Sequence, residues 1–176
     1  PAASAAFEMA VLNWWCSYKK KTLKDLLAIP SQRVRTTLTF SKSDKGDLSS
    51  KLHLLNNFSH MKIKLTGDDD DIDFVKYIKR QSAKSYIVDI NQGVKSIDKG
   101  LKLCEQLAEL DCTLIEQPLH KDDIEGHQRL KQEIEVPIIA DESIRSFEDL
   151  KQRGEAFDGV NLKLMKCGGL KPSLQM

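Results

Sequence analysis

The stretch SHMKIKLTGDDDDIDF at residues 59–74 places a strand pattern directly before the start of a helix. Apolar residues alternate with lysines over residues 61–65, which predicts a short strand with Lys62 and Lys64 on one face. The four aspartates at 68–71 precede an amphipathic run, and acidic residues favour the positive end of a helix dipole. A helix is therefore expected to begin there, and the stretch is a candidate βα unit.

The same alternation of strand and helix patterns extends along most of the chain. The six strand-like runs are residues 35–40, 61–65, 85–90, 112–118, 136–143 and 159–165. Amphipathic helices are predicted between them at residues 49–58, 71–81, 96–110, 123–134 and 146–155. Strands that alternate with helices are typical of an α/β fold with a parallel sheet. Two further helical segments, 4–21 and 22–30, precede the first strand.

The composition is that of an ordinary globular protein and argues against some classes of partner. The chain has 176 residues, 40% of them hydrophobic, and a formal net charge of +1. This balance creates no field that would attract nucleic acid or an anionic membrane, and no apolar run approaches the roughly 20 residues that span a bilayer. We therefore expect no nucleic-acid partner and no membrane partner. The four cysteines form no CxxC pair, so free thiols and a cytoplasmic location are expected.

One polar residue stands near the carboxyl end of each strand from the second to the sixth. These residues are Lys64, Asp89, Glu116, Asp141 and Lys163, spaced 22 to 27 residues apart. Each step is one βα unit, so the five side chains are expected to converge at one edge of a curved parallel sheet. In (β/α) barrels, this edge is where active sites are built.

Three of these five residues are acids, and together they predict a metal site. Carboxylates alone make a hard oxygen site that suits Mg²⁺, with Mn²⁺ as the alternative, better than it suits zinc. No histidine is predicted at a strand end, which weakens a zinc site further. The histidines, all predicted in helices or loops, are His53, His60, His120 and His127. Asp89, Glu116 and Asp141 are thus the candidate metal ligands.

Lysines complete the predicted chemistry. Repulsion between Lys62 and Lys64 favours the loss of one proton and lowers a lysine pKa, and a neutral lysine is a base. Lys163 would approach a bound substrate from the other side. Two bases that flank a metal suit removal of a proton beside a carbonyl group and its return to the opposite face, which is racemase or epimerase chemistry. If only one lysine acts as the base, the same site suits β-elimination or cycloisomerisation.

Taken in order, several motifs resemble those of the enolase superfamily in its muconate-lactonizing subgroup. They are EMAVLNWW (8–15), LKDLLAIP (23–30), KIK (62–64), DINQG (89–93), IEQPL (115–119), IADES (139–143) and NLKLMKCGGL (161–170). The resemblance extends from about Ala5 to Leu170 and is strongest to the L-Ala-D/L-Glu (dipeptide) epimerases. Lysine rather than histidine on the sixth strand separates this subgroup from the mandelate racemase-like dehydratases.

The resemblance implies a role for each residue of the predicted site. Asp89, Glu116 and Asp141 would bind Mg²⁺. Lys64 and Lys163 would act as the two general acid/bases of a 1,1-proton transfer through a metal-stabilised enolate.

Four further residues acquire roles from the same resemblance. Lys62 would lie beside the carboxylate oxygens of the substrate, and Thr37 would contact the substrate. Asn91 and Glu142 would be supporting residues. The implied partner is a small-molecule substrate, a dipeptide or a related carboxylate, and a homo-oligomer is an open alternative for the assembly.

The resemblance also implies parts that this sequence does not contain. Members of the superfamily have an N-terminal capping domain and an eight-stranded barrel. Here residues 1–33 are expected to be the helical connection from a capping domain, and residues 34–176 a partial TIM-type (β/α) barrel with about six of the eight strands. Six strands cannot close such a barrel, so the chain alone is expected to be inactive.

Three functions are consistent with these observations. The first is a Mg²⁺-dependent epimerase of dipeptides. The second is o-succinylbenzoate synthase or a muconate cycloisomerase-type lyase, which would use the same lysine pair. The third, from a different class, is a non-catalytic barrel fragment or scaffold, which would leave the five aligned polar residues unexplained.

Overall fold

The computed structural model describes residues 1–28, 30, 34–44 and 48–176, and its contacts divide the chain into two compact units. The first unit contains Pro1–Val34, Ile144–Gln152 and Leu162–Met176, and the second contains Arg35–Ser143 and Arg153–Asn161. The domain boundary predicted after residue 33 falls on residues outside the described ranges, and it stays a prediction.

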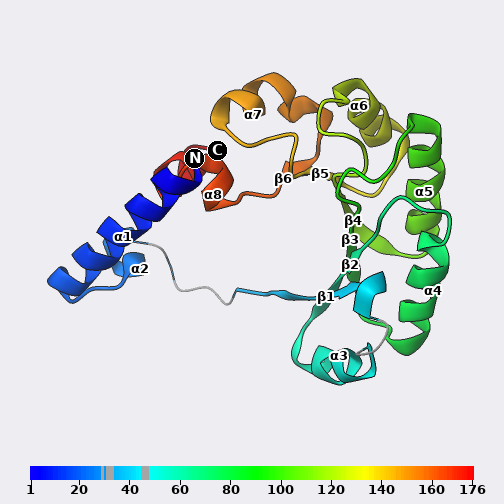
Figure 1. Ribbon diagram of the computed structural model, residues 1–176, viewed down its shortest axis with the longest axis horizontal. Coiled ribbons are helices and arrows are strands. Elements are labelled where there is room, and N and C mark those ends of the chain that lie inside the picture. Colours follow the sequence, from blue (N-terminus) through cyan, green and yellow to red (C-terminus); the bar gives the residue numbers. More distant parts are fainter. Residues whose placement is uncertain (29, 31–33, 45–47) are drawn as a thin grey trace. The chain divides into compact units, whose positions relative to one another are not determined.

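The second unit is built on a parallel sheet, which has six strands in chain order among the described residues (Figure 1). The strands are β1 (Thr37–Ser41), β2 (His60–Lys64), β3 (Tyr86–Asp89), β4 (Cys112–Glu116), β5 (Ile138–Ala140) and β6 (Gly159–Val160). Lys64 pairs with Asp89 across β2 and β3, and Asp89 pairs with Glu116 across β3 and β4. The predicted α/β fold is confirmed, and three predicted site residues end neighbouring strands in register.

Helices connect successive strands, and Figure 1 shows α4 and α5 along one side of the sheet. The helical segments are η1 (Lys42–Asp44), α3 (Leu48–Leu54), η2 (Leu55–Asn57), α4 (Asp71–Gln81), α5 (Ile97–Glu109), α6 (Ile124–Glu133), α7 (Phe147–Arg153) and η3 (Gly154–Ala156). Side-chain caps fix where several of these helices begin: Ser96 accepts from the Lys99 N–H before α5, and Asp123 accepts from the Gly126 N–H before α6.

A helix begins at the last of the four aspartates at 68–71, as predicted. α4 begins at Asp71, whose buried carboxylate accepts hydrogen bonds from the backbone N–H groups of Thr66 and Gly67. The same carboxylate lies 2.6 Å from the Nζ atom of Lys42. Asp71 therefore fixes the turn that follows β2 and also holds the residue that follows β1.

The core of the second unit lies between the sheet and its helices. Met61 and Ile63 of β2 are fully buried, whereas Lys62 is half-buried and Lys64 is exposed. The alternation predicted for this strand is confirmed, with its apolar side chains on one face and its lysines on the other. Other fully buried residues of this core are Val75 and Ile78 of α4, Val88 of β3, Leu107 of α5, Ile115 of β4 and Leu130 of α6.

The turns that follow β2 and β3 approach each other more closely than side chains would allow. A Cβ atom on Gly93 would lie 2.1 Å from the carbonyl oxygen of Thr66, and one on Gly67 would lie 2.4 Å from the carbonyl carbon of Gly93. Gly67 also has a φ of +80°, a conformation that glycine adopts without steric cost. Only glycines permit this backbone contact. It joins the turn that follows Lys64 to the turn that contains Asn91.

Several strands differ from the predictions, and β5 spans Ile138–Ala140 where residues 136–143 were expected. The sixth strand was expected over residues 159–165, but β6 ends at Val160 and residues 164–167 form helix α8. Gly168 follows this helix in the left-handed conformation, and glycine there commonly ends a helix, so the sequence CGG contained the signal. His60 was expected outside a strand but is the first residue of β2, at the end opposite to the predicted site.

The first unit is helical in the parts of the chain that the structure describes. It contains α1 (Ala2–Lys19), α2 (Leu23–Leu26), α8 (Leu164–Cys167) and α9 (Leu170–Gln175), together with most of α7. The Glu8 carboxylate of α1 accepts from the backbone N–H groups of Leu170 and Lys171, which neutralises free donors at the start of α9. No helix within the described ranges is long and apolar enough to cross a bilayer.

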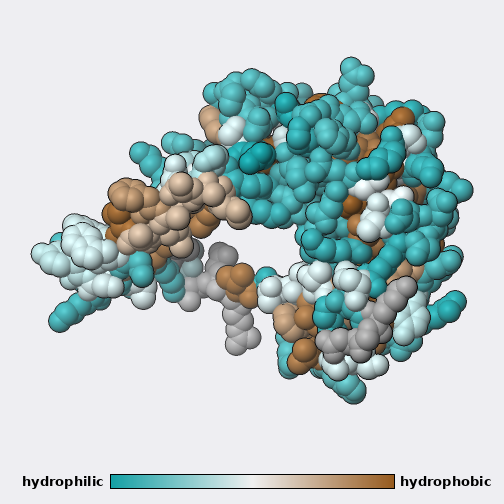
Figure 2. All heavy atoms as spheres, in the orientation of Figure 1, coloured by the Kyte–Doolittle hydropathy of each residue, from teal (hydrophilic) through white to brown (hydrophobic). Residues whose placement is uncertain are grey.

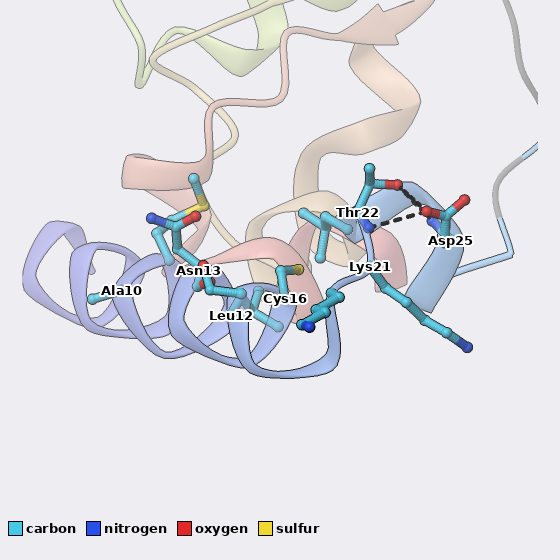
Figure 3. A pocket seen from close by; sticks show the side chains of 11 residues that line it. Ala10, Leu12, Asn13, Cys16, Lys21, Thr22 and Asp25 are labelled. Carbon is cyan, nitrogen blue, oxygen red and sulfur yellow. Dashed lines mark hydrogen bonds between the residues drawn. The ribbon is translucent and has the colours of Figure 1, made fainter.

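Helix α1 exposes large apolar side chains, and Phe7, Val11, Trp14 and Tyr18 recur at helical spacing along one face. The rings of Trp14 and Tyr18 stack with centroids 5.8 Å apart, yet their residues are 62% and 66% exposed. Figure 2 shows brown, apolar spheres along this helix. A pocket of about 930 Å³ opens where α1 turns into α2, and Figure 3 shows Leu12, Cys16 and Thr22 along its wall.

Candidate active site

Lys62 joins two of the three predicted metal ligands. Its Nζ atom lies 2.7 Å from an oxygen of Asp89 and 2.7 Å from an oxygen of Glu116. The side chains are 16%, 3% and 4% exposed for Lys62, Asp89 and Glu116, so all three are largely removed from water. Buried carboxylates require a positive partner, and Lys62 supplies it here.

The pKa of Lys62 moves in the direction opposite to the lowering that lysine–lysine repulsion predicted for one member of the Lys62/Lys64 pair. Burial acts to lower its pKa, but hydrogen bonds and charges from Asp89 and Glu116 outweigh burial and raise the pKa above the ordinary value. The predicted lowering of a lysine pKa is therefore wrong for Lys62. The reason is that acids from the next two strands lie nearer to its ammonium group than the sequence pattern revealed.

Asn91 connects Lys64 to Asp89. The Asn91 side-chain oxygen accepts from the Lys64 Nζ at 3.2 Å, and the Asn91 backbone N–H donates to Asp89 Oδ1 at 3.2 Å. Asn91 adopts a φ of +47°, which asparagine tolerates better than most residues. A pocket of about 400 Å³ opens beside Lys64 and Asn91, at the ends of β1, β2 and β3. A small substrate could therefore reach Lys64 from solvent.

Asn161 is a contact that the sequence patterns did not identify. Its side-chain amide donates to Glu116 Oε1 at 2.7 Å, while Lys62 binds the other oxygen of the same carboxylate. Glu116 is thus oriented from both sides. Asn161 is the first residue of the motif NLKLMKCGGL, but its position in that motif did not indicate a contact with Glu116.

Asp141 and Glu142 follow β5, where the predicted edge of the sheet continues. Asp141 is 2% exposed, and Glu142 is half-buried. The backbone N–H of Asp141 donates to the side-chain oxygen of Gln117 at 2.8 Å. Gln117 was not among the predicted site residues, although it directly follows Glu116.

The donor set suits Mg²⁺, but the acids are not gathered around one point. Asp89 and Glu116 offer carboxylate oxygens, the ligand type that suits a hard ion, and both accept from the ammonium group of Lys62. Within the part of the chain that the structure describes, no three acidic, histidine or cysteine side chains are arranged to hold a metal ion. The Lys62 ammonium group lies between the two acids. The assignment of Asp89, Glu116 and Asp141 as ligands stays a prediction.

The contacts of Thr37 and Lys163 do not test the roles predicted for them. Thr37 is the first residue of β1 and pairs with His60, whereas Thr39 is the threonine that pairs with Lys62. Lys163 belongs to the first unit, where it immediately precedes α8 and its carbonyl oxygen accepts from the Lys166 and Cys167 N–H groups. The roles of Thr37 and Lys163 stay predictions.

Comparison with known proteins identifies similarity over most of the chain. The model of a family described as enolase C-terminal domain-like matches residues 49–176. The L-Ala-D/L-Glu epimerase of Bacillus subtilis is 33% identical over 181 residues, which cover 96% of this chain and 49% of that protein. The o-succinylbenzoate synthase of Listeria innocua is 26% identical over 182 residues, which cover 99% of this chain and 47% of that protein.

A solved structure supports the same similarity. The dipeptide epimerase from Enterococcus faecalis, complexed with Mg and the dipeptide L-Leu-L-Tyr, matches with a TM-score of 0.88 and 30% sequence identity. The match covers 99% of this chain and 51% of that one. The chain therefore spans about half the length of these relatives.

Proposed function

The chain belongs to the enolase C-terminal domain-like family, and we propose that the protein is a Mg²⁺-dependent epimerase of dipeptides. The observation that carries this proposal is that Asp89 and Glu116, at the carboxyl ends of β3 and β4, are buried side by side and bind the same ammonium group of Lys62. Lys64, which ends the neighbouring strand, lies beside them through Asn91. The epimerases of Bacillus subtilis and Enterococcus faecalis, at 33% and 30% identity, point to the same activity.

The lysines would perform the proton transfers. Lys64, in its neutral form, would remove the α-proton of the C-terminal residue of the dipeptide, and Lys163 would return a proton to the opposite face. In the reverse direction the two lysines would exchange roles. Lys62 would hold its positive charge against Asp89 and Glu116 and beside the carboxylate of the substrate. This arrangement supports inversion at one carbon without any bond to the protein.

Asp89, Glu116 and Asp141 would hold the metal ion. They are acidic residues at or directly after the ends of β3, β4 and β5, and each is almost completely buried. The negative charge that develops on the substrate carboxylate as the proton leaves is stabilised when Mg²⁺ is bound. A strongly bound carboxylate substrate would also explain why this edge of the sheet needs a fixed lysine such as Lys62.

An exchange experiment in D₂O tests the proposal. The full-length protein is incubated with Mg²⁺ and L-Ala-L-Glu, and ¹H NMR follows the loss of the α-proton signal of the glutamate residue together with the appearance of L-Ala-D-Glu. We expect both exchange and epimerisation, and we expect chelation of Mg²⁺ to abolish them. A protein that exchanges no α-proton in any of a panel of dipeptides is not a dipeptide epimerase.

The second candidate is o-succinylbenzoate synthase. The relative with this name in Listeria innocua aligns over 99% of the chain at 26% identity, and the same lysine pair suits an elimination. Dehydration of a hydroxycyclohexadiene carboxylate to the aromatic benzoate by the full-length protein, without α-proton exchange in dipeptides, would favour this function over the first.

A further inference from the structure

Gln117 binds to three consecutive strand ends at once. Its backbone N–H donates to the Ile139 carbonyl of β5 at 2.9 Å, and its carbonyl accepts from the Gln92 N–H, after β3, at 2.8 Å. Its side-chain oxygen accepts from the N–H groups of Asp141 at 2.8 Å and Ser143 at 3.1 Å. Gln117 itself follows Glu116, the last residue of β4, so it touches the end of every strand that carries a proposed metal ligand.

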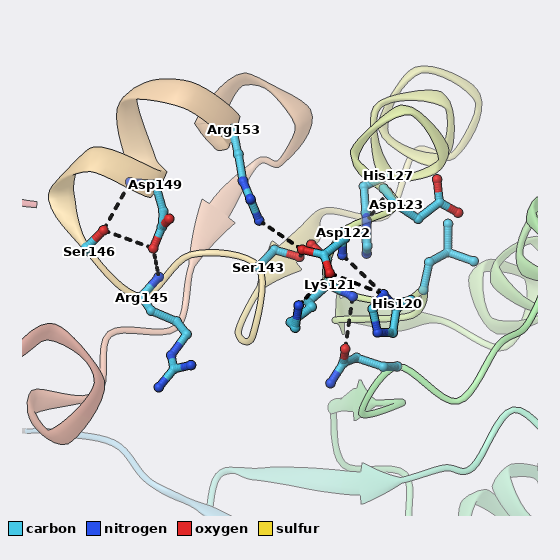
Figure 4. Close-up of polar contacts among 12 residues, drawn as sticks. His120, Lys121, Asp122, Asp123, His127, Ser143, Arg145, Ser146, Asp149 and Arg153 are labelled. Atoms are coloured by element: carbon cyan, nitrogen blue, oxygen red, sulfur yellow. Dashed lines mark hydrogen bonds and ion pairs between the residues drawn. The ribbon is translucent and has the colours of Figure 1, made fainter. Parts of the chain in front are cut away.

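The orientation of the Gln117 amide is determined by its neighbours. Two backbone N–H groups point at its oxygen, and a donor cannot face a donor, so the amide cannot be reversed. On the other side, its nitrogen donates to Ser143 Oγ at 2.7 Å. The Ser143 hydroxyl in turn donates to the Lys121 carbonyl at 2.9 Å, and Figure 4 shows these two residues together.

A buried histidine accepts the remaining hydrogen of the amide. His127 Nδ1 lies 2.6 Å from the Asp123 carbonyl, which only accepts, so the ring proton is on Nδ1. Nε2 is then the acceptor for the Gln117 amide at 3.2 Å, and the Leu119 carbonyl, also at 3.2 Å, shares that hydrogen. Gln117 and His127 are fully buried and Ser143 is 1% exposed, so water cannot replace these bonds.

Gln117 accepts an unfavourable backbone conformation at this point. Its φ is +42°, in the left-handed region where a residue with a Cβ atom is strained. Glycine would remove the strain but would also remove the side chain that binds Asp141 and Ser143. The strain is therefore compensated by the side-chain contacts.

We propose that Gln117 is a positioning residue, which sets the affinity of this site for a divalent cation by fixing the carboxyl ends of β3, β4 and β5 relative to one another. The proposal rests on the proposed function in one respect, namely that Asp89, Glu116 and Asp141 hold Mg²⁺. Gln117 touches neither substrate nor metal in this arrangement. It acts through the backbone of Asp141, through Glu116 as its neighbour in the chain, and through Gln92, which lies in the turn that carries Asn91.

The test compares Gln117→Met, which keeps the length of the side chain but removes its polar atoms, with Tyr86→Phe in the full-length protein. Tyr86 donates one hydrogen bond to the Leu110 carbonyl at the opposite end of β3, so its variant loses a largely buried hydrogen bond without touching the site. Hydrogen–deuterium exchange of the Asp141 and Ser143 amides is measured without metal. Mg²⁺ affinity is measured by calorimetry, and stability by urea unfolding.

We expect Gln117→Met to accelerate exchange of both amides and to weaken Mg²⁺ binding about tenfold or more, as loss of a group that orients ligands commonly does. Tyr86→Phe is expected to lower stability while leaving both measurements within twofold of the wild type. Unchanged exchange and unchanged Mg²⁺ affinity in Gln117→Met overturn the proposal.

Two further measurements keep the conclusions separate. If Gln117→Met does not fold, Ser143→Ala removes one partner of the amide, and it must accelerate the same exchange and weaken Mg²⁺ binding for the proposal to stand. Asp141→Asn tests the proposed function by itself. If wild type and Asp141→Asn bind Mg²⁺ equally, the ligand assignment is wrong. The hydrogen–deuterium exchange of the Asp141 and Ser143 amides still tests whether Gln117 fixes this part of the backbone.

Discussion

Asp89 and Glu116 end neighbouring parallel strands at paired positions, and their carboxylates accept from the same ammonium group of Lys62, at 2.7 Å each. Both acids are buried, and Lys62 is the positive charge that lies between them. Without it, two like charges would face each other in a region that excludes water. Lys62 therefore contributes to stability in the metal-free protein as well as to the proposed chemistry.

Replacement of Lys62 by methionine is expected to lower the free energy of unfolding by about 3 to 5 kcal/mol in metal-free buffer, because buried carboxylates lose their partner. Addition of Mg²⁺ should recover part of this loss, since a ligand that binds only the folded state stabilises it. Urea unfolding with and without Mg²⁺ measures both effects. Lys64→Met is the control: Lys64 is exposed, so a change within about 0.5 kcal/mol is expected. Equal stability of the two variants would contradict the role given to Lys62.

Single substitutions of the two proposed bases should separate the two proton transfers. In Lys64→Ala or Lys163→Ala, epimerisation is expected to fall by about 10²-fold to 10⁴-fold, the usual contribution of a general base. Each variant should still exchange the α-proton of one epimer, because one base remains, and the two variants should retain opposite epimers. ¹H NMR in D₂O with L-Ala-L-Glu and L-Ala-D-Glu measures this, with Lys102→Ala on the exposed surface of α5 as the control. Equal exchange of both epimers in both variants would rule out the two-base scheme.

Gly93→Ala should be strongly destabilising. The new methyl carbon would lie 2.1 Å from the Thr66 carbonyl oxygen. Because that oxygen belongs to the backbone and cannot rotate away as a side chain would, the turns after β2 and β3 must separate. We expect a loss of about 3 kcal/mol in the free energy of unfolding. Gly100→Ala, in α5, is the matched control: its Cβ would lie 3.3 Å from a flexible leucine side chain, and alanine favours a helix. A loss in Gly93→Ala no larger than that in Gly100→Ala would show that the turns can move apart.

Stability should decrease on acidification because of His127. Burial lowers the pKa of His127 below its ordinary value of 6.5, although the Asp123 carbonyl opposes this in part. The unfolded chain therefore takes up a proton at a pH where the folded protein does not. The contribution of His127 is complete above about pH 6.5 and is lost as the pH falls through the lower, folded-state pKa. Urea unfolding between pH 8 and pH 5 measures the slope, and His127→Gln should reduce it. An identical slope in the variant would assign the acid sensitivity to other groups.

The four thiols should react at two different rates. Burial raises the pKa of Cys104 to about 12 and that of Cys112 to about 11, and both residues are buried. Cys16 and Cys167 are half-buried. Alkylation at pH 8 should therefore modify Cys16 and Cys167 first, because the thiolate is the reactive form and access is needed. Peptide mass spectrometry measures the order, and labelling in urea shows that all four thiols can react. Early modification of Cys104 would contradict the burial described here.

The positions of Lys64, Asp89 and Glu116 could be predicted because they depend on local patterns. A strand alternates its faces, a repeated βα unit returns each strand end to the same edge, and the register of β2, β3 and β4 confirms this arrangement. The helix that starts at Asp71 followed from the preference of acids for a helix N-terminus.

Other parts of the site depend on distances between residues far apart in the chain. Nothing in the sequence near Gln117 indicates that its amide binds Asp141 and Ser143, because that contact requires a left-handed backbone at one position. The rise in the pKa of Lys62 has a similar origin, since it depends on side-chain conformations of two other strands. The end of β6 was missed because the alternating run NLKLM suits a strand and a short helix equally well.

The contact between Gly67 and Gly93 also limits how this part of the molecule can move. Two turns whose backbones touch have no room to swing independently, so they are expected to shift together as one body. Lys64 and Asn91 sit on either side of that contact and would keep their spacing during any such displacement. Access to the pocket beside Lys64 would then be controlled by segments other than these two turns. Lys64, the proposed proton acceptor, would keep its position relative to Asn91 while a substrate enters or leaves.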